Sequence, residues 1–359
     1  MTGTASCSAL RRKGREGSEP VPGEEAMMEM LPDFVGNPEE VALFGGEEGL
    51  APLRLAHLAP GVKLSFHIFM AADGIPGEFV LTWRRGRALP KRVQEMIWGY
   101  FAVAEAGEVL SYLESRLEEF RNGGKSFEPI RLLVDTLLVW TQHFFCHEAA
   151  RTPKNLALAR GLISSLARVL GDSEDAMGMV SPLRRHDSGL FSHCLNVCLL
   201  ALGFFPDLAW EGEKGETLAL GALLHDLGMM PWAQETFHQT TPLSDQDWEK
   251  IKTHPDQGAE FLEFLELPDE ILLMLRQHHE SANGSGYPRG LQGDEIHPWA
   301  KVLRIVDSYE AITSLRPWRP PVSERQALRL MASAWMAQGS YDQDFLERFL
   351  AFCQGKKRA

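Results

Sequence analysis

The sequence is poor in cysteine, and positive charge is in the minority. The five cysteines among 359 residues are Cys7, Cys146, Cys194, Cys198 and Cys353. This odd and scattered set excludes a disulfide framework and favours packed thiols in a reducing cytoplasm. Lysine and arginine together number 36 against 49 aspartates and glutamates, so no broad basic surface is available for a nucleic-acid polymer. A small phosphate ligand is compatible with this charge, because two or three well-placed arginines can bind one.

Long apolar runs are also few. The first twenty residues carry a basic cluster with no apolar segment after it, so we expect no secretory signal there. The longest uncharged stretch runs from Ser188 to Pro206 and contains His193 and Asn196. Polar groups of this kind are costly in lipid, so we expect a buried core helix and no membrane span.

Composition and periodicity divide the chain into four parts. Residues 1–30 are polar and aperiodic, which predicts disorder. Residues 31–125 predict a small α/β accessory or regulatory domain, in which residues 64–83 alternate as two strands of a hairpin do and a helix follows. Residues 126–180 carry helical apolar stripes, which predict connecting helices and a candidate dimer surface. Residues 181–355 hold most of the histidines and form the last part.

In this last part, histidine and aspartate recur on helix faces that should otherwise be apolar. The residues concerned are His193, His225, Asp226, His254, His278, His279 and Asp307. A buried carboxylate needs a partner, which a metal ion or a salt bridge can supply, and a single core histidine is more often structural than a ligand. Several such residues from five segments favour metal, because imidazole and carboxylate are the ligands of iron, manganese or zinc. They suit two ions about 3.5–4 Å apart, the arrangement that hydrolyses phosphate esters.

Turn residues and arginines accompany these segments. Gly228 predicts the end of the apolar helix that precedes it. The loop ESANGSGYPRG, residues 280–290, contains glycines that allow the backbone to approach a ligand closely. Downstream, Arg316 and Arg319 are spaced to pair with a phosphate, although each alone is as well explained by a solvated surface charge.

These segments together resemble the HD-GYP family, a branch of the HD phosphohydrolases. The matching pieces lie between about Arg184 and Phe349 and read FSHCLNV, LLHDLG, IKTHPDQGAEFL, RQHHESANGSGYPRGLQGDEI, VLRIVDSYEAITSLRPWRP and GSYDQDFLERF. The resemblance covers nearly half of the chain. It implies a mainly α protein, with an all-helical HD-type phosphohydrolase domain over residues 181–355, preceded by a small α/β (α+β) domain and linker helices. Residues 53–120 are also similar to a small module often found ahead of such domains.

The resemblance also implies a function and a ligand set. It implies a metal-dependent phosphodiesterase that hydrolyses cyclic di-GMP to pGpG, GMP or both in signal transduction, with metals that are usually iron and sometimes manganese. Matched by motif, one ion would be held by His193, His225, Asp226 and Asp307, and the other by Asp226, His254, His278 and His279. Asp226 would bridge the two ions and carry the catalysis together with His225. Substrate contacts are expected from Gly286, Tyr287, Pro288, Arg316 and Arg319.

The sequence departs from the family pattern at two positions. Family members with three metals carry a glutamate four residues before the first histidine, where this chain has Gly189, so we expect two ions. The family's HDxGK motif ends in lysine, whereas this chain has Met229. The lysine is thought to neutralise the scissile phosphate or to assist the leaving oxygen, and losing one such contact costs on the order of 10²–10³ in rate. Lys252 lies nearby in the sequence.

Three functions are compatible with this pattern. The first is an active cyclic di-GMP phosphodiesterase, which the intact ligand set favours. The second is a weak or inactive HD-GYP protein that senses cyclic di-GMP or acts as a protein-interaction module, which Met229 favours. The third is an HD hydrolase of another nucleotide, such as a related cyclic dinucleotide. A second copy of the chain or a signalling protein is a candidate partner in each case.

Overall fold

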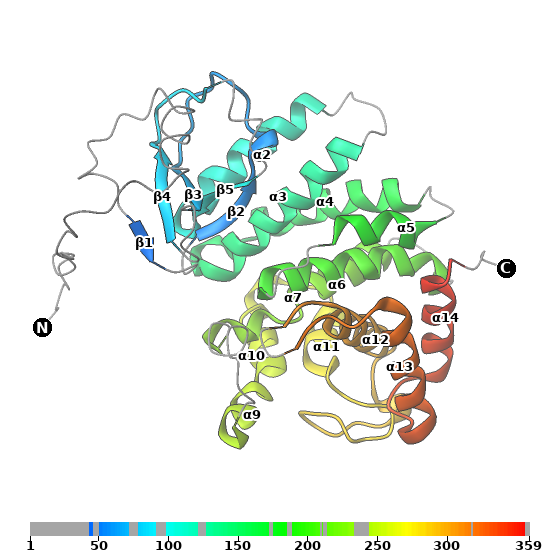
Figure 1. The fold of residues 1–359 in the computed structure, drawn as a ribbon. Coiled ribbons are helices and arrows are strands. Elements are labelled where there is room, and N and C mark those ends of the chain that lie inside the picture. Colours follow the sequence, from blue (N-terminus) through cyan, green and yellow to red (C-terminus); the bar gives the residue numbers. More distant parts are fainter. Residues whose placement is uncertain are drawn as a thin grey trace, which may run out of the picture. The chain divides into compact units, whose positions relative to one another are not determined.

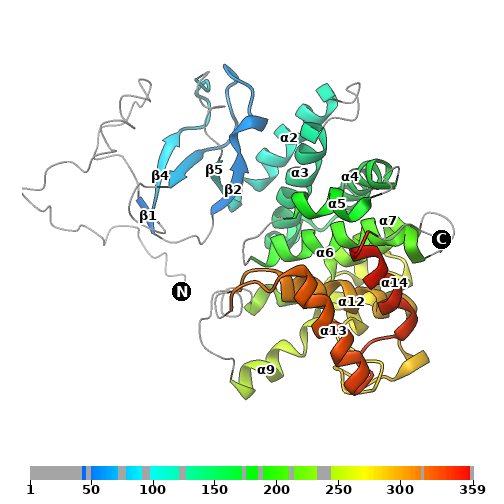
Figure 2. The ribbon, with the colours of Figure 1, turned by 45° about the vertical axis from the view of Figure 1, so that its right-hand side comes forward.

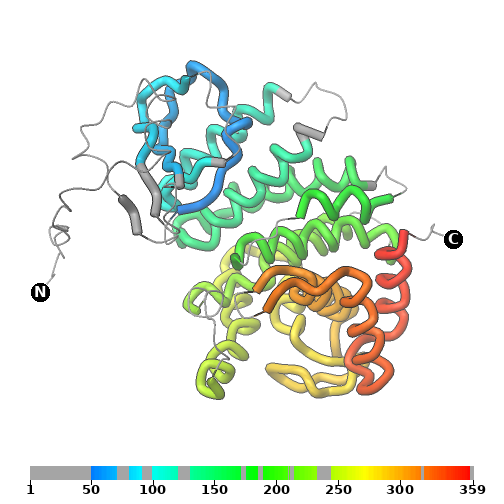
Figure 3. The backbone as a smooth tube through the Cα atoms, in the orientation of Figure 1, coloured from blue at the N-terminus to red at the C-terminus, as the bar shows by residue number. Residues whose placement is uncertain are grey.

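The structure, a computed structural model, describes residues 43–45, 50–71, 78–90, 98–120, 127–171, 175–184, 189–208, 210, 214–232, 244–316 and 319–355. Figure 3 traces the chain from blue at the N-terminus to red at the C-terminus. The chain divides into two compact units, residues 1–101 and residues 102–359. The expected disorder of residues 1–30 lies outside the described residues.

The first unit is built on a five-stranded sheet with the strand order β1-β4-β3-β5-β2. The strands are β1 (Leu43–Gly45), β2 (Leu50–Arg54), β3 (Ile68–Ala71), β4 (Glu78–Trp83) and β5 (Trp98–Ala102). Strands β3 and β4 pair antiparallel, with Ala71 opposite Phe79, which confirms the expected hairpin. The first hairpin strand begins only at Ile68, later than the alternation predicts. Leu64 and Phe66 are buried ahead of it and belong to no strand.

The second unit is built of helices (Figure 1), which confirms the predicted mainly α architecture. Its α-helices are α2 (Ala106–Phe120), α3 (Phe127–Cys146), α4 (Pro153–Gly171), α5 (Ala176–Val180), α6 (Leu190–Phe204), α7 (Lys214–Leu224), α9 (Asp245–Ile251), α10 (His254–Glu260), α11 (Asp269–Gln277), α12 (Pro298–Thr313), α13 (Glu324–Gln338) and α14 (Gln343–Cys353). Short 3₁₀ helices lie between them, namely η4 (Val103–Glu105), η5 (Glu148–Ala150), η6 (Ser181–Leu183), η7 (Phe205–Leu208), η8 (Leu227–Trp232), η9 (Glu263–Leu265) and η10 (Gly293–Glu295), and η2 (Leu55–His57) belongs to the first unit.

Helix α2 belongs to the second unit, because the division of the chain falls after Phe101. The accessory domain predicted for residues 31–125 would include this helix. Leu110 and Leu113 form its buried face, and α2 packs against α3. In turn α3 packs against α6, and α4 packs against both α6 and α7. The segment expected to connect the domains therefore contributes to the core of the second unit.

Helix α6 lies at the centre of the second unit. All of its residues except Phe191 are buried, including His193 and Asn196, and it packs along α7 and α12. By length and composition the stretch Leu190–Leu208 could cross a membrane, but 78% of its apolar window is buried inside the protein. The expected buried core helix is thereby confirmed.

The remaining helices of this unit bring distant parts of the sequence against α6 and α7. Helix α10 packs on α11 and η8, and α12 packs on both α6 and α11. Figure 2 shows α13 and α14 beside α12, in agreement with their packing contacts. Ser244 begins α9 through a capping box with Asp247, and α10 follows it closely. This packing places the ends of α7 and α11, the start of α10 and the middle of α12 near one another.

Candidate metal centre

His225 and Asp226 occupy the turn that follows α7. The helix ends at Leu224, so Gly228 does not end it as predicted, but lies in η8 where the backbone meets α10. A Cβ on Gly228 would lie 2.1 Å from the carbonyl oxygen of His254, which is closer than a side chain can approach. The missing side chain allows η8 and α10 to touch, and this contact sets His254 beside Asp226.

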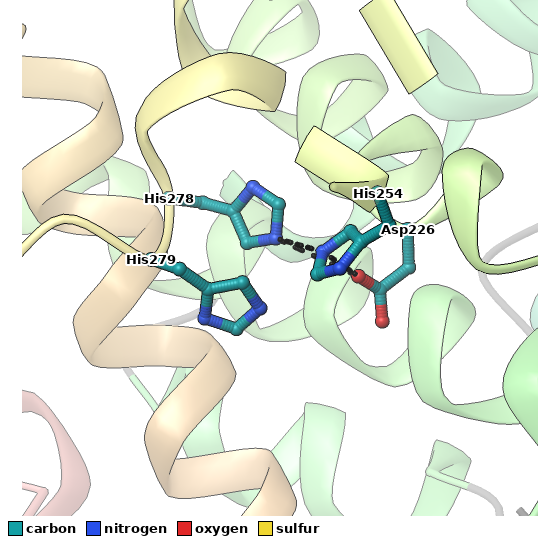
Figure 4. A group of neighbouring side chains, drawn as sticks. All are labelled: Asp226, His254, His278 and His279. Carbon is teal, nitrogen blue, oxygen red and sulfur yellow. Dashed lines mark hydrogen bonds and ion pairs between the residues drawn. The ribbon is translucent and has the colours of Figure 1, made fainter. Parts of the chain in front are cut away.

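One oxygen of the Asp226 carboxylate faces two histidines (Figure 4). His254, the first residue of α10, places its Nε2 3.1 Å from Oδ1 of Asp226. His278, which directly follows α11, places its Nε2 3.5 Å from the same oxygen. The two Nε2 atoms lie 3.1 Å apart. His279 completes this group, whose potential ligand atoms all lie within 4.8 Å of one another.

The other oxygen of Asp226 faces a second group. The Nε2 atoms of His193 and His225 each lie 3.5 Å from Oδ2 of Asp226. Asp307 on α12 adds a carboxylate oxygen 3.1 Å from Nε2 of His193 and 4.0 Å from Nε2 of His225. The structure therefore brings together all the histidines and aspartates that the sequence singled out, with Asp226 between the two groups.

Three of the histidines are oriented by carbonyl oxygens of their own turns. Their Nδ1 atoms donate to the residue three positions earlier, His225 to Ala222 (2.8 Å), His254 to Ile251 (2.7 Å) and His278 to Leu275 (2.8 Å). A neutral imidazole that donates from Nδ1 carries a lone pair on Nε2. Each Nε2 therefore points toward Asp226 as an acceptor, which is the form that binds a metal.

Atoms at this centre lack the partner that a metal would supply. Within the described residues, Nε2 of His225 and Oδ1 of Asp226 are buried and make no hydrogen bond. Burying such acceptors unpaired is costly, and lone pairs of imidazole and carboxylate that face each other repel unless a cation lies between them. Nitrogen and carboxylate-oxygen donors suit iron, manganese or zinc. The residues present therefore fit two divalent cations, with Asp226 shared between them.

The electrostatics agree with this fit at His225, His279 and Asp226. Burial lowers the pKa of His225 to about 4, and burial together with neighbouring imidazoles lowers the pKa of His279 well below its usual value. Burial alone would raise the pKa of Asp226, but the imidazoles around it, His225 foremost, hold it well below its ordinary range. Neutral imidazoles and ionised carboxylates are the forms that coordinate metals. His193 differs, because neighbouring carboxylates, Glu310 foremost, outweigh burial and raise its pKa to about 10.

Glu310 holds the histidine of α6 in place. Its Oε2 accepts a hydrogen bond from Nδ1 of His193, and its Oε1 accepts from Nδ2 of Asn196 (2.9 Å) and from Oγ of Ser314. The carboxylate is 1% exposed, so its neighbours satisfy it in place of water. A carboxylate of this kind fixes the ring of a metal-binding histidine. Sequence reasoning missed Glu310, although its position nearly one helical turn after Asp307 was a usable signal.

Comparison with known proteins points to the same region. Residues 179–345 match the family model described as the HD domain. Residues 179–345 form an HD domain. Together with phosphodiesterase relatives and a solved HDG"Y"P protein of the same fold, this match confirms the predicted resemblance to the HD-GYP family.

Relatives of the HD domain include phosphodiesterases of cyclic dinucleotides. A cyclic di-GMP phosphodiesterase of Pseudomonas aeruginosa is 27% identical over 195 residues, covering 54% of this chain and 46% of the relative. A 3'3'-cGAMP-specific phosphodiesterase of Vibrio cholerae is 28% identical over 156 residues, covering 44% of this chain and 36% of the relative. The chain thus spans less than half the length of these two relatives. A solved HDG"Y"P protein of Bdellovibrio bacteriovorus shares the fold, with a TM-score of 0.63 at 18% identity over 85% of this chain and 99% of that chain.

The glycine-rich loop at residues 280–290 lies against His279. The backbone N–H of Tyr287 donates to the carbonyl oxygen of His279 at 3.1 Å, and the two rings stack with their centroids 4.7 Å apart. A Cβ on Gly286 would lie 2.3 Å from the amide nitrogen of Ser281, so glycine is required for this approach. Pro288 continues the same loop. These residues border the candidate metal centre, and their contact with a substrate stays a prediction.

Glu280 stabilises this loop by accepting hydrogen bonds from its backbone. The sequence did not single out this residue. Its side chain is 1% exposed, with Oε1 accepting from the backbone N–H of Arg289 (2.7 Å) and Oε2 from that of Leu291 (3.0 Å). Hydrogen bonds to an ionised carboxylate are among the stronger ones in proteins. The available signal was its place directly after the two histidines, at the start of the glycine-rich loop.

The two arginines expected at the phosphate already have partners in the HD domain. Nη2 of Arg316 lies 3.8 Å from Oε2 of Glu310. Arg319 donates from Nη1 to the carbonyl oxygen of Ile312 (2.9 Å) and from Nη2 to that of Ala311 (2.7 Å), near the end of α12. Arg316 is therefore close to the candidate metal centre, whereas Arg319 stabilises a helix end. Their contact with a phosphate stays a prediction.

Position 229 lies beside the centre but carries no charge. Met229 is 3% exposed, and its backbone N–H donates to the carbonyl oxygen of Asp226 at 2.9 Å. Lys252 does not take the place of a lysine there, because its Nζ pairs with Glu249 at 2.7 Å on an exposed surface. Gly189 directly precedes α6 and offers no carboxylate for a third ion.

Proposed function

We propose that this chain is a metal-dependent phosphodiesterase that hydrolyses cyclic di-GMP. The observation that carries the proposal is the position of Asp226, whose two carboxylate oxygens face two separate groups of imidazoles. A carboxylate between two ions is typical of centres that hydrolyse phosphate esters. The names of the relatives, which are phosphodiesterases of cyclic dinucleotides, support the same reaction class.

We assign the two ions, iron or manganese, to the two groups that share Asp226. His193, His225 and Asp307 would complete one site, and His254, His278 and His279 the other. When bound, the ions would supply Lewis acidity toward the phosphodiester and neutralise charge that develops on its oxygens.

The protein's own residues orient and shield this centre. His225 and Asp226 are neighbours in one turn, so they keep a fixed relation to each other. Tyr287 stacks on His279 and limits the access of water to that imidazole. Burial raises the pKa of Tyr287, so its hydroxyl stays protonated and can donate a hydrogen bond to an anionic ligand.

Cyclic di-GMP is the substrate that the motif resemblance and the first relative favour. A related cyclic dinucleotide is the second candidate, because a relative of similar identity is named as specific for 3'3'-cGAMP. The products of the proposed reaction are pGpG, GMP or both. A cytoplasmic location, and a second copy of the chain or a signalling protein as partner, belong to the same proposal.

The alternative function is that of a cyclic di-GMP sensor on an HD scaffold. Met229 supports it, because an uncharged side chain one turn after Asp226 cannot neutralise a phosphate, and the residue is buried. Such a protein would bind the ions and the dinucleotide without turning it over.

Metal analysis and turnover on one sample test the proposal. Protein purified without oxygen should contain two iron or manganese ions per chain and form pGpG or GMP from cyclic di-GMP. His225→Ala and Asp226→Ala should lose turnover, whereas Asp294→Ala, which alters an exposed carboxylate of the same domain, should keep it. Unchanged turnover in the first two variants would contradict the proposal.

The variant Met229→Lys separates the enzyme from the sensor. For a sensor, the wild-type protein binds cyclic di-GMP without forming product, and the new lysine raises turnover by as much as about 10²–10³. For the enzyme, the wild-type protein already forms product. Binding and product formation are measured on the same metal-loaded samples.

A further inference from the structure

Arg304 lies on α12, nearly one helical turn before Asp307. Its Nη1 donates to the carbonyl oxygen of His279 at 3.3 Å, and its guanidinium carbon lies 5.7 Å from the centre of the Tyr341 ring. Residues three apart on a helix share a face, so Arg304 and Asp307 leave α12 on the same side. The guanidinium is therefore at the edge of the candidate metal centre, beside the residue that carries one of its imidazoles.

The positive charge of Arg304 has no carboxylate partner in the described part of the chain. Its bond to His279 is to a neutral carbonyl oxygen, and its buried Nε makes no hydrogen bond. Lys301 on the same helix provides the contrast, because its Nζ pairs with Asp342 at 3.2 Å and with Asp294 at 3.6 Å. A partly buried cation without an anion is unfavourable unless a ligand supplies one.

Among the residues that the structure describes, the two other arginines expected at the phosphate already have partners. Arg316 faces Glu310, and Arg319 donates to backbone carbonyl oxygens at the end of α12. At position 229 the chain carries an uncharged methionine. The guanidinium of Arg304 therefore has N–H donors that bind no described carboxylate and can bind a phosphate at the centre.

We propose that Arg304 binds the phosphate of the ligand and supplies the positive charge that position 229 lacks. The inference rests on the proposed function, since it assigns a further residue to the same site. A guanidinium forms charge-assisted hydrogen bonds with phosphate oxygens in a fixed planar geometry. The Tyr341 ring helps to hold that plane through a cation–π contact.

Phosphate binding to the metal-loaded full-length chain tests this assignment. Calorimetry with inorganic phosphate should give about 10- to 100-fold weaker binding for Arg304→Gln than for the wild type, the range expected for a hydrogen bond between charged groups. The KM for cyclic di-GMP should rise by a similar factor. Arg304→Lys should recover part of the affinity. Lys301→Gln, the matched control on the same helix, should bind phosphate as the wild type does.

Metal content and Tm distinguish phosphate binding from a structural role. Arg304→Gln should keep two ions per chain and the wild-type Tm. Phosphate affinity unchanged in Arg304→Gln would overturn the inference. A loss of metal or a lower Tm that accompanies the loss of affinity would also overturn it, because Arg304 would then act only by holding the backbone of His279.

Failure of the proposed function gives a different result. If the wild type binds inorganic phosphate but neither binds nor hydrolyses cyclic di-GMP, the proposed substrate is wrong. The comparison of Arg304→Gln with the wild type on inorganic phosphate still decides the role of Arg304. If the metal-loaded wild type binds neither compound, both proposals are overturned.

Discussion

Gly228 and His254 meet backbone to backbone, and this contact ties the turn that carries Asp226 to the start of α10. A Cβ on Gly228 would lie 2.1 Å from the carbonyl oxygen of His254 and 2.7 Å from the amide nitrogen of Gly258. A Cβ on Gly258 would lie 3.1 Å from the amide nitrogen of Gly228. Because both sides of the contact are glycines, the distance from His254 to Asp226 is set by the main chain.

We therefore expect Gly228→Ala to destabilise the protein and weaken metal binding together. Backbone atoms must move to admit the methyl group, and overpacking of this kind typically costs about 1–3 kcal/mol. Urea unfolding and metal content measure the two effects. The control is Gly161→Ala on the exposed face of α4, where nothing lies within 4 Å of the added Cβ, and it should stabilise the protein by about 0.5–1 kcal/mol. Equal stability of the two variants would contradict this account.

Glu310→Gln should weaken the ion assigned to the His193 group and spare the other. The substitution keeps the size of the side chain but removes the charge that faces Nδ1 of His193. Removing the supporting partner of a ligating histidine usually lowers metal affinity or activity about 10- to 100-fold. Metal content after dialysis should fall toward one ion per chain. Glu347→Gln, an exposed change on α14, should keep two, and equal retention by both variants would count against the support role of Glu310.

Removal of the metals should lower the thermal stability of the wild-type chain. Ions that bind only the folded state at about 100 times their Kd contribute about 2.7 kcal/mol each. Tm is compared with and without a chelator by circular dichroism. Asp226→Asn replaces the carboxylate shared by both groups with a neutral amide. In this variant the chelator should change Tm much less. A wild-type Tm that is insensitive to complete metal removal would contradict the assigned sites.

The described cysteines should react slowly with thiol reagents in the native protein. Burial raises the pKa of Cys194 and Cys198 well above the ordinary range, and both side chains are fully buried. Burial raises the pKa of the more accessible Cys146 to about 11. At pH 8 this leaves about 100-fold less thiolate than an ordinary thiol of pKa 9 would have, so alkylation slows in proportion. Rates mapped by mass spectrometry test this, and rapid native modification of Cys194 or Cys198 would argue against packed thiols.

The helices and the clustered residues could be predicted because each left a local pattern. A histidine or aspartate interrupts an otherwise apolar helical stripe, as His193 does in α6 and Asp307 does in α12. The carboxylates that support the site left a weaker pattern. Glu280 and Glu310 look like surface charges in the sequence. Glu280 is held by the backbone N–H of Arg289, nine residues later, and Glu310 accepts from Asn196 on another helix, as well as from nearby Ser314.

The partner in a close backbone approach could not be predicted from local pattern. Gly228 has the sequence context of a helix end, but its role depends on α10, which comes later in the chain. Arg319 matches a phosphate-contacting position by motif, whereas its donors reach carbonyl oxygens of α12. In both cases the sequence gives the residue type that a contact needs, and tertiary packing decides which contact forms.

The hydrogen bonds from His225, His254 and His278 to their own turns have an entropic consequence. Immobilising a side chain at the moment of binding costs about 0.5–1.5 kcal/mol. In this chain the three imidazole rings lose their rotational freedom when the protein folds, so little of that loss falls on the arrival of an ion. The affinity for the ions then depends on backbone hydrogen bonds that form during folding. It does not depend on the groups that contact a phosphate. A substitution at a position such as 229 can therefore lower the rate of hydrolysis while the ions stay bound. Such a substitution can convert an enzyme into a protein that binds the ligand without hydrolysing it.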